Sequence, residues 1–139
     1  VNSFQRFSLP SVTIVKSASG TYLPGQFATF SNTVNNTGDG PAFTLEVINT
    51  IGDFISIELI DNGGTWSALD SLSGGYTVLE EKFDDGNGLF DYNPDVEGVC
   101  ALPAAAPCYD PAITHWRILL NENIPVGGNV IQTYRAQVE

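Results

Sequence analysis

The sequence predicts an all-β fold, an antiparallel sandwich of two sheets with seven or more strands. Short runs in which apolar and polar residues alternate recur along the chain. Clusters of Gly, Pro, Asn and Asp separate these runs. Apolar residues nowhere keep helical spacing for about three turns without a Gly, a Pro or a β-branched run. With 139 residues, the chain has the size of one domain with its own core.

Two strands and a turn are predicted in the first third of the chain, at residues 26–35 and 42–50. Alternation places Phe30 and Val34 on one face of the first strand, and Phe43, Leu45 and Val47 on one face of the second. The Asn-Thr-Gly-Asp-Gly-Pro segment between them combines glycines, which accept positive φ, with side chains that bond to the local backbone. We therefore expect these two strands to form a hairpin.

Further strands are predicted on both sides of this pair. They cover residues 11–17, 54–60, 65–68, 75–82, 113–120 and 129–138. The Asp-Asn-Gly-Gly segment at residues 61–64 predicts a second hairpin. In the penultimate strand, alternation points Trp116, Ile118 and Leu120 to the core and Ile113, His115, Arg117 and Leu119 outward. In the last strand it points Val130, Tyr134 and Val138 inward.

The charge balance excludes some partners. The chain carries 16 acidic and 5 basic residues, a net charge of −11. Such a surface repels nucleic-acid phosphates and anionic lipids, so we expect no nucleic acid as a partner. No apolar run approaches the roughly 20 residues that cross a bilayer, so we expect no membrane insertion. Methionine is absent even at position 1, which predicts removal of a secretory signal peptide and a location outside the cell or on its surface.

The two cysteines predict one disulfide. Cys100 and Cys108 are separated by residues 101–107, and this spacing does not match a zinc site with four ligands. A bond between them would close a small ring and add about 2–3 kcal/mol to the free energy of unfolding. Two free buried thiols are the alternative, but an oxidising compartment favours the disulfide.

Residues 1–9 are a predicted extension in front of a β-sandwich domain at residues 10–139. Phe4, Phe7 and Leu9 give this extension more apolar surface than an exposed tail usually carries. Two interpretations remain open. The extension packs on its own domain as an extra edge strand, or it pairs with a sheet edge of a neighbouring copy. In the second case these three residues are the assembly contacts, and copies of the same chain are the partners.

An acidic stretch at residues 80–97 is the candidate for binding a metal. The candidate ligands are Asp85, Asn87, Asp91 and Asp95, with Asp84 and Glu97 able to complete the shell. Oxygen ligands spaced around glycines are typical of loops that bind calcium. The glutamate that completes the helix-flanked calcium motif is absent, so we expect weak calcium binding and no required cofactor. A solvated acidic loop is the alternative.

Catalytic chemistry has little support in the sequence. His115 is the only histidine, and its neighbours Thr114 and Tyr109 do not form a known triad pattern with it. Adjacent carboxylates in a glycine-rich loop seldom build the rigid cleft that a glycosidase needs. We therefore predict that the protein is not an enzyme. Trp66 follows a Gly-Gly turn and is a candidate exposed aromatic for glycan binding, and Asn35 begins an N-glycosylation sequon.

Several turn motifs resemble a known family. A Pro-Gly turn at 24–25, the Asn-Thr-Gly turn at 36–38 with Ala42 behind it, and Ile-Pro-Val-Gly-Gly at 124–128 before a long strand are similar to the prokaryotic surface-repeat family called domain of unknown function eleven. Residues 110–117 resemble the segment before the penultimate strand of such domains. The resemblance implies an immunoglobulin-like sandwich in a secreted or cell-surface protein, without a known enzymatic site.

The chain departs from this family pattern in three ways. Asn32 stands where an aliphatic residue is usual, residues 65–95 form a longer and more acidic segment, and the domain stands alone instead of in tandem. A solitary domain favours a protein that works by self-assembly. We expect a structural or adhesive surface protein, a subunit of a pilus-like filament or matrix fibre that is linked through its N-terminal strand. The alternative is a secreted module that binds surface glycans with the help of calcium.

Overall fold

The computed structural model describes residues 8–20 and 23–139, and these residues form strands and loops without a helix. The all-β prediction is confirmed. The strands are β1 (Val12–Gly20), β2 (Phe27–Asn36), β3 (Glu46–Thr50), β4 (Ile55–Asp61), β5 (Trp66–Ser67), β6 (Ser71–Leu72), β7 (Val78–Asp84), β8 (Cys108–Asp110), β9 (His115–Leu120) and β10 (Asn129–Val138). No helix capable of crossing a membrane is found in the part of the chain that the structure describes.

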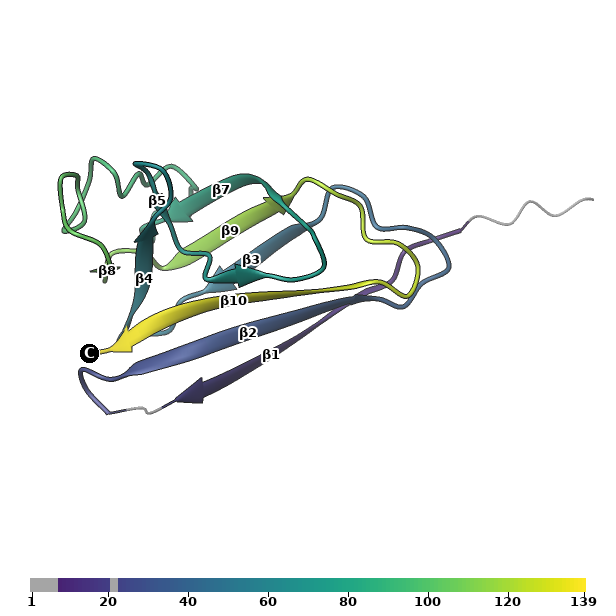
Figure 1. Cartoon of the computed structure of the whole chain (residues 1–139), viewed down its shortest axis with the longest axis horizontal. Helices are drawn as coiled ribbons and strands as arrows, with labels where there is room; N and C mark the ends of the chain where they lie inside the picture. The colour runs from purple at the N-terminus through teal and green to yellow at the C-terminus, as the bar shows by residue number, and fades with distance from the viewer. Residues whose placement is uncertain (1–7, 21–22) are drawn as a thin grey trace, which may run out of the picture.

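The strands form two antiparallel sheets that enclose a common core (Figure 1). The larger sheet has the strand order β1-β2-β10-β4-β5, with β6 paired to β10 and β8 paired to β4. The smaller sheet has the order β3-β9-β7. The predicted two-sheet sandwich is therefore present, and β6 and β8 are short strands that the sequence pattern did not predict.

The core lies where strand alternation predicts it. Its buried residues from β9 and β10 include Trp116, Ile118, Leu120, Val130 and Tyr134. The Tyr134 ring packs edge-on against Trp116 and stacks on Phe30, with ring centroids 5.3 and 5.0 Å apart. Ile113 was expected to point outward but is buried, because it lies in an irregular segment before β9 and does not follow the alternation of the strand.

A polar cluster joins the two sheets through the core. Asn32 of β2 donates from Nδ2 to Asn49 Oδ1 of β3 and to Gln132 Oε1 of β10. Asn49 donates to the same Gln132 oxygen, and all three side chains are buried. Buried amides cost free energy unless they are hydrogen-bonded. The cluster therefore explains how the core accommodates Asn32, and it fixes β3 over β2 and β10.

The hairpin predicted between residues 26–35 and 42–50 is wrong. β2 pairs with β1 and β10, whereas β3 pairs with β9 in the other sheet. The connecting loop crosses between the sheets because Ala42 pairs with Ile124. The Asn36 side chain holds this crossing by donating to the backbone oxygens of Gly40 and Ile124.

The same loop changes the position of one predicted core residue. Thr44 has a φ of 53°, which interrupts the strand alternation. Phe43 therefore does not share a face with Val47, and it is exposed while Val47 is buried. The second predicted hairpin is confirmed, since β4 and β5 pair across residues 61–64.

The sandwich is elongated, and its two ends are built from different loops (Figure 1). We call the end made of residues 8–11, 37–45 and 121–128 the tip, and the end made of residues 23–25, 51–54 and 139 the base. At the base, the Gly25 N–H donates to Val138 O, and the Glu139 N–H donates to Phe54 O. β1 and β3 each begin beside the tip loops and run towards the base.

Candidate functional site

The side of the sandwich at β5 and β7 is closed by a carboxylate. Glu81 on β7 reaches the larger sheet, where its oxygens accept hydrogen bonds from Ser67 Oγ and the Ala68 N–H, both at 2.8 Å. It also accepts one from Trp116 Nε1 at 2.8 Å. Burial raises the pKa of Glu81 above its ordinary value, and the three hydrogen bonds act against that rise. Side-chain hydrogen bonds thus join the two sheets on this side.

The opposite side, at β1 and β3, is open. Val12 and Ile14 of β1 pair with the buried residues Asn36 and Val34 of β2, so their side chains point to the inner face of the sheet. No strand within the described residues covers them, and they remain 42% and 54% exposed. A groove of about 280 Å³ lies here between the two sheets. It is lined by Val12, Ile14, Val34, Leu45, Glu46, Val47 and Ile48.

Both strands that border this groove are sheet edges. β1 is the outer strand of the larger sheet and β3 is an outer strand of the smaller one, so each has one edge that pairs with no other described strand. Free edges are templates for pairing with another chain. Natural edges are usually protected by charges or bulges, whereas this groove is mostly apolar. The site is therefore suited to receive an extended segment with apolar side chains.

Lys16 limits the apolar part of the open side. Its Nζ lies 5.5 Å from the centre of the Phe30 ring and 5.3 Å from that of Tyr134, at cation–π distance. Burial lowers the pKa of Lys16. Because Lys16 follows Ile14 on the same face of β1, the apolar groove lies in the half of the strand that is nearer the tip.

Leu9 is held by the tip of its own domain. Its N–H donates to Asp39 Oδ1 at 2.9 Å, and its carbonyl accepts from the N–H groups of Asp39 and Gly40. Glycine is required at position 38, where a Cβ atom would lie 2.3 Å from the Leu9 oxygen. The Leu9 side chain remains 65% exposed. Phe4 and Phe7, the other two predicted assembly residues, lie outside the described residues.

The structure brings together some of the predicted calcium ligands and separates others. Asn87 Nδ2 donates to Asp91 Oδ1 at 3.1 Å, and Asp85 is exposed in the same loop. Asp95 points elsewhere, since its Oδ1 accepts the Trp66 N–H at 2.8 Å. Asp84 Oδ1 accepts backbone N–H groups within its own loop. Among residues 8–20 and 23–139, no three His, Cys, Asp or Glu side chains are grouped as they would be around a metal ion.

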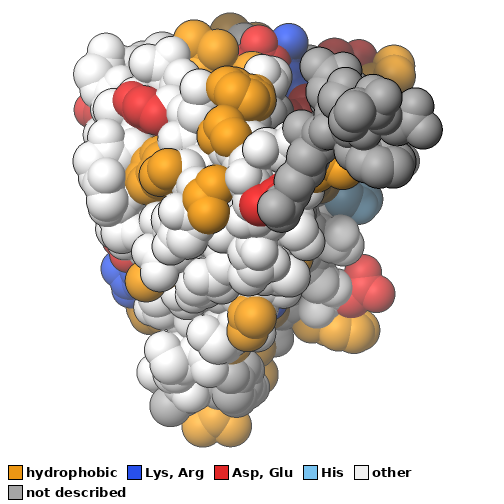
Figure 2. Space-filling model, turned by 90° about the vertical axis from the view of Figure 1, so that its right-hand side faces the viewer, with side chains coloured by type: hydrophobic (Ala, Val, Ile, Leu, Met, Phe, Trp, Pro, Cys, Tyr) orange, Lys and Arg blue, Asp and Glu red, His pale blue; other side chains and the backbone are white. Residues whose placement is uncertain are grey.

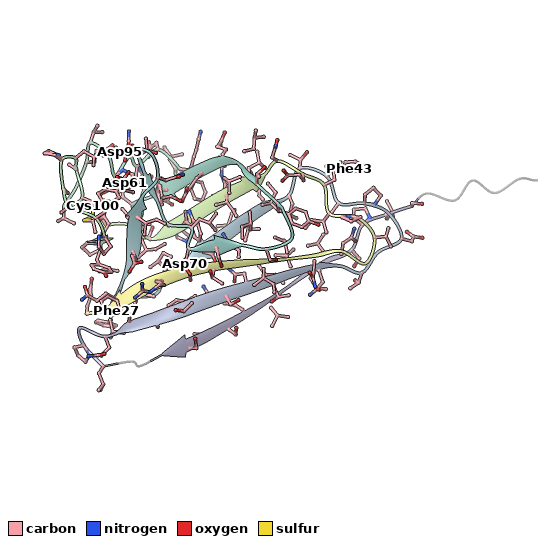
Figure 3. All side chains as sticks on the ribbon, viewed as in Figure 1. Phe27, Phe43, Asp61, Asp70, Asp95 and Cys100 are labelled. Carbon is pink, nitrogen blue, oxygen red and sulfur yellow. A yellow bond between two sulfur atoms is a disulfide. The ribbon has the colours of Figure 1, made fainter. Side chains whose placement is uncertain are left out.

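The predicted disulfide between Cys100 and Cys108 is confirmed, with the two Cα atoms 5.9 Å apart. The expected exposure of Trp66 is wrong, because this side chain is only 6% exposed and its Nε1 donates to Cys100 O. The turn after β4 folds β5 back and carries Trp66 under the disulfide loop. A hollow of about 550 Å³ opens beside it, lined in part by Asp95, at the end of the molecule where Figure 3 labels Asp61, Asp95 and Cys100.

His115 and Asn35 occupy ordinary positions on strands. Thr114 Oγ1 lies 3.0 Å and Asp84 Oδ2 lies 3.5 Å from the same His115 nitrogen, Nδ1. A catalytic triad instead uses both ring nitrogens of the histidine. Asn35 is half-buried on β2, between its partners Thr13 on β1 and Asn129 on β10.

The groove is not among the sites predicted from the sequence, although one signal was present. Val12 and Ile14 alternate within a predicted strand, but the sequence alone does not show that this strand lies beyond the edge of the opposite sheet. The fold and the groove together define a two-sheet β-sandwich in which the described residues close one side and leave the other side open. Comparisons with protein-family models, with curated proteins and with solved structures found no match to the chain.

Proposed function

We propose that the protein is an extracellular, non-enzymatic structural subunit that assembles into filaments, in which residues 1–7 of one copy enter the groove of the next copy. The observation that carries this proposal is the uncovered inner face of β1, where Val12 and Ile14 border an apolar hollow. A strand added to the free edge of β3 would cover both side chains. An immunoglobulin-like strand arrangement and kinship with the surface-repeat family belong to the same proposal, and the turn motifs support them.

The chemistry of residues 1–7 suits this groove. The segment contains Phe4 and Phe7, has no acidic residue, and has Arg6 as its charged side chain, whereas the whole chain has a net charge of −11. In an extended strand, Phe4 and Phe7 point to opposite faces. One of them would enter the groove, while the other would lie on the outer surface of the smaller sheet. We therefore expect Phe4→Ala and Phe7→Ala to weaken assembly to clearly different extents.

The direction in which the chain leaves the domain favours a neighbouring copy as the acceptor. The bonds of Leu9 to Asp39 and Gly40, and of the Thr37 N–H to Ser11 O, continue the pairing of β1 with β2 beyond the end of the strand. At Ser8 the chain therefore points away from its own groove. Because the donated segment and the accepting groove are different surfaces, such a contact repeats from copy to copy and builds a filament.

Removal of residues 1–7 tests this proposal. The full chain and the shortened protein are compared at equal concentration by negative-stain electron microscopy and by light scattering. We expect filaments from the full chain, monomers from the shortened protein, and binding of a synthetic peptide of residues 1–7 to the shortened protein. The proposal is wrong if the shortened protein forms the same filaments, or if the full chain stays monomeric at high concentration.

A further inference from the structure

We propose that Asn62, in the turn between β4 and β5, is a modification site at which the side-chain amide is converted spontaneously to a carboxylate through a succinimide. Asn62 is exposed and is followed by Gly63. The inference goes beyond the proposed filament and does not depend on it, because neither residue lines the groove.

The reaction takes place between an asparagine side chain and the backbone nitrogen of the next residue. That nitrogen loses its proton and bonds to the side-chain carbon Cγ, while the bond from Cγ to Nδ2 breaks and ammonia leaves with a proton. Water then opens the succinimide ring at either of its carbonyls. One opening gives aspartate, and the other gives isoaspartate, in which the main chain continues through the side chain. Glycine in the next position favours the attack, because it has no side chain in the way and its backbone is permissive.

Two Asn-Gly pairs occur in the chain, and both are open to water. They are Asn62-Gly63, and Asn87-Gly88 in the loop after β7. All four residues are exposed. Both glycines have a positive φ, and an added Cβ atom on either would meet no other described part of the chain within 4 Å. Residue type, exposure and space therefore do not distinguish the two pairs.

Hydrogen bonds hold the reacting atoms of the second pair. Asn87 Oδ1 accepts the Leu89 N–H at 2.7 Å, and Asn87 Nδ2 donates to Asp91 Oδ1 at 3.1 Å. The Gly88 nitrogen, which would make the attack, donates its hydrogen to Asp84 Oδ1 at 3.2 Å. The side chain and the attacking nitrogen are thus both engaged, and these bonds have to open before the pair can react.

The reacting atoms of the first pair lack such partners. Among the described residues, neither the Asn62 side chain nor the Gly63 nitrogen makes a hydrogen bond. Other atoms close this turn, since the Asn62 N–H donates to Thr65 O and the Gly64 N–H donates to Asp61 Oδ1. The Asn62 side chain can therefore rotate towards the next nitrogen without loss of a bond.

Isoaspartate at this position would loosen the closed side of the sandwich. It adds a carbon atom to the main chain of the turn that joins β4 to β5, whose paired residues are Ile60 with Ser67 and Asp61 with Trp66. Ser67 also donates to Glu81, which joins the two sheets. We expect the melting temperature of the converted protein to fall by about 3 °C.

The turn lies far from the tip. Figure 3 labels Asp61, which directly precedes Asn62, at the opposite end of the molecule from Phe43. Figure 2 views the tip, and it shows hydrophobic side chains gathered on that end. We therefore expect the protein concentration needed for assembly, measured by light scattering, to be the same before and after conversion.

Peptide mapping of the full chain tests the inference. The protein is incubated at mildly alkaline pH, either folded or unfolded in urea, and mass spectrometry of the digest follows the replacement of the amide by a carboxylate at each pair. In the folded protein we expect Asn62 to react at least about tenfold faster than Asn87, because each hydrogen bond that has to open lowers the reactive fraction. In urea, where these bonds are lost, the two sites should react at similar rates.

Asn62→Gln is the control, because glutamine would have to form a larger ring and reacts far more slowly. This variant should keep its melting temperature during the incubation, whereas that of the unchanged chain falls. Equal rates at the two sites of the folded protein, a folded Asn62 that does not react, or the same preference for Asn62 in urea would each overturn the inference.

Discussion

The two sides of the sandwich differ in how their sheet edges are satisfied. At β5 and β7, Glu81 binds Ser67, Ala68 and Trp116 and joins the two sheets through polar contacts. At β1 and β3, apolar side chains border a groove and both edges are free of described partners. Among the described residues, the closed side is therefore satisfied within the chain, whereas the open side is completed by a second chain only in the proposed filament. Changes on the closed side should affect folding, and changes on the open side should affect assembly.

The largest expected effect is on the open side. Ile14→Glu places a carboxylate in the apolar groove, where an incoming strand would have to remove it from water. We expect the protein concentration needed for assembly to rise at least about 100-fold. The free energy of unfolding should change by less than about 0.5 kcal/mol, because Ile14 is exposed in the monomer. Assembly is followed by light scattering, and unfolding by urea titration.

Val15→Glu is the matched control for this change. It adds the same charge to the same strand on the opposite face, at a site that is also exposed. We expect its assembly to stay close to that of the unchanged chain. Equal losses in the two variants would mean that charge, and not the groove, controls assembly.

On the closed side, Glu81→Ala should destabilise the fold. The change leaves three donors, Ser67 Oγ, the Ala68 N–H and Trp116 Nε1, without their acceptor. Loss of the acceptor costs about 1–3 kcal/mol for each donor that stays dry. Because the shorter alanine side chain lets water reach part of this space, we expect a total loss of about 2–4 kcal/mol in urea unfolding. Leu79→Ala, on the same strand, should cost less than about 0.5 kcal/mol. A loss for Glu81→Ala as small as that of the control would contradict the closing role of Glu81.

Removal of the disulfide should lower the free energy of unfolding somewhat less than Glu81→Ala does. The bond between Cys100 and Cys108 closes a short ring over Trp66. Replacing both cysteines by serine should lower the free energy of unfolding by about 2–3 kcal/mol, since a short ring restricts the unfolded chain only moderately. Filament formation at a temperature where the variant is folded should persist. If this variant folds but does not assemble, the disulfide loop takes part in the contact between copies.

The buried Glu81 carboxyl should also make the stability of the closed side depend on pH. Its pKa is raised in the folded state from the ordinary 4.5, chiefly by burial. The folded protein therefore binds this proton more readily than the unfolded chain. The contribution of this proton to the free energy of unfolding is fully present below pH 4.5, and it is lost as the pH rises through the pKa of the folded state. We expect the stability of the unchanged chain relative to Glu81→Gln to increase as pH falls from neutral towards 4.5. A flat or falling difference would count against a buried Glu81.

The smallest expected effect concerns the acidic loop. If Asp85, Asn87 and Asp91 bind calcium weakly as the sequence predicts, millimolar calcium should raise the melting temperature by about 2 °C relative to chelator. Magnesium at equal ionic strength and the Asp85→Asn variant are the controls, because general screening of the net charge of −11 would act in all of them. Equal melting temperatures with calcium and chelator would contradict the prediction.

Strand alternation predicted the fold class and most of the core, because each side chain's face is a local property of its strand. Trp116, Ile118 and Tyr134 are buried as predicted. The pairing of strands was less predictable. The turn at 36–41 has hairpin chemistry, yet the next strand joins the other sheet, because Ala42 pairs with Ile124, a residue far along the chain. Local sequence patterns do not predict long-range contacts of this kind.

The candidate site could also be predicted only in part from local sequence patterns. The apolar character of residues 1–9 could be predicted, whereas the groove that would accept them depends on the smaller sheet having three strands while β1 lies beyond its edge. For Trp66, the local pattern predicted an exposed side chain that the structure buries. A Gly-Gly turn indicated exposure, but the disulfide loop covers the indole. Burial by a loop of another segment leaves no trace in the residues around the turn.

The most direct test of the proposed filament is a cryo-electron microscopy structure of the assembled full chain. We expect an extra strand in the groove between β1 and β3 that contacts Val12, Ile14 and Val47, that carries the side chains of residues 1–7, and that comes from a neighbouring copy. An empty groove, or a groove filled by the N-terminal segment of the same copy, would contradict it.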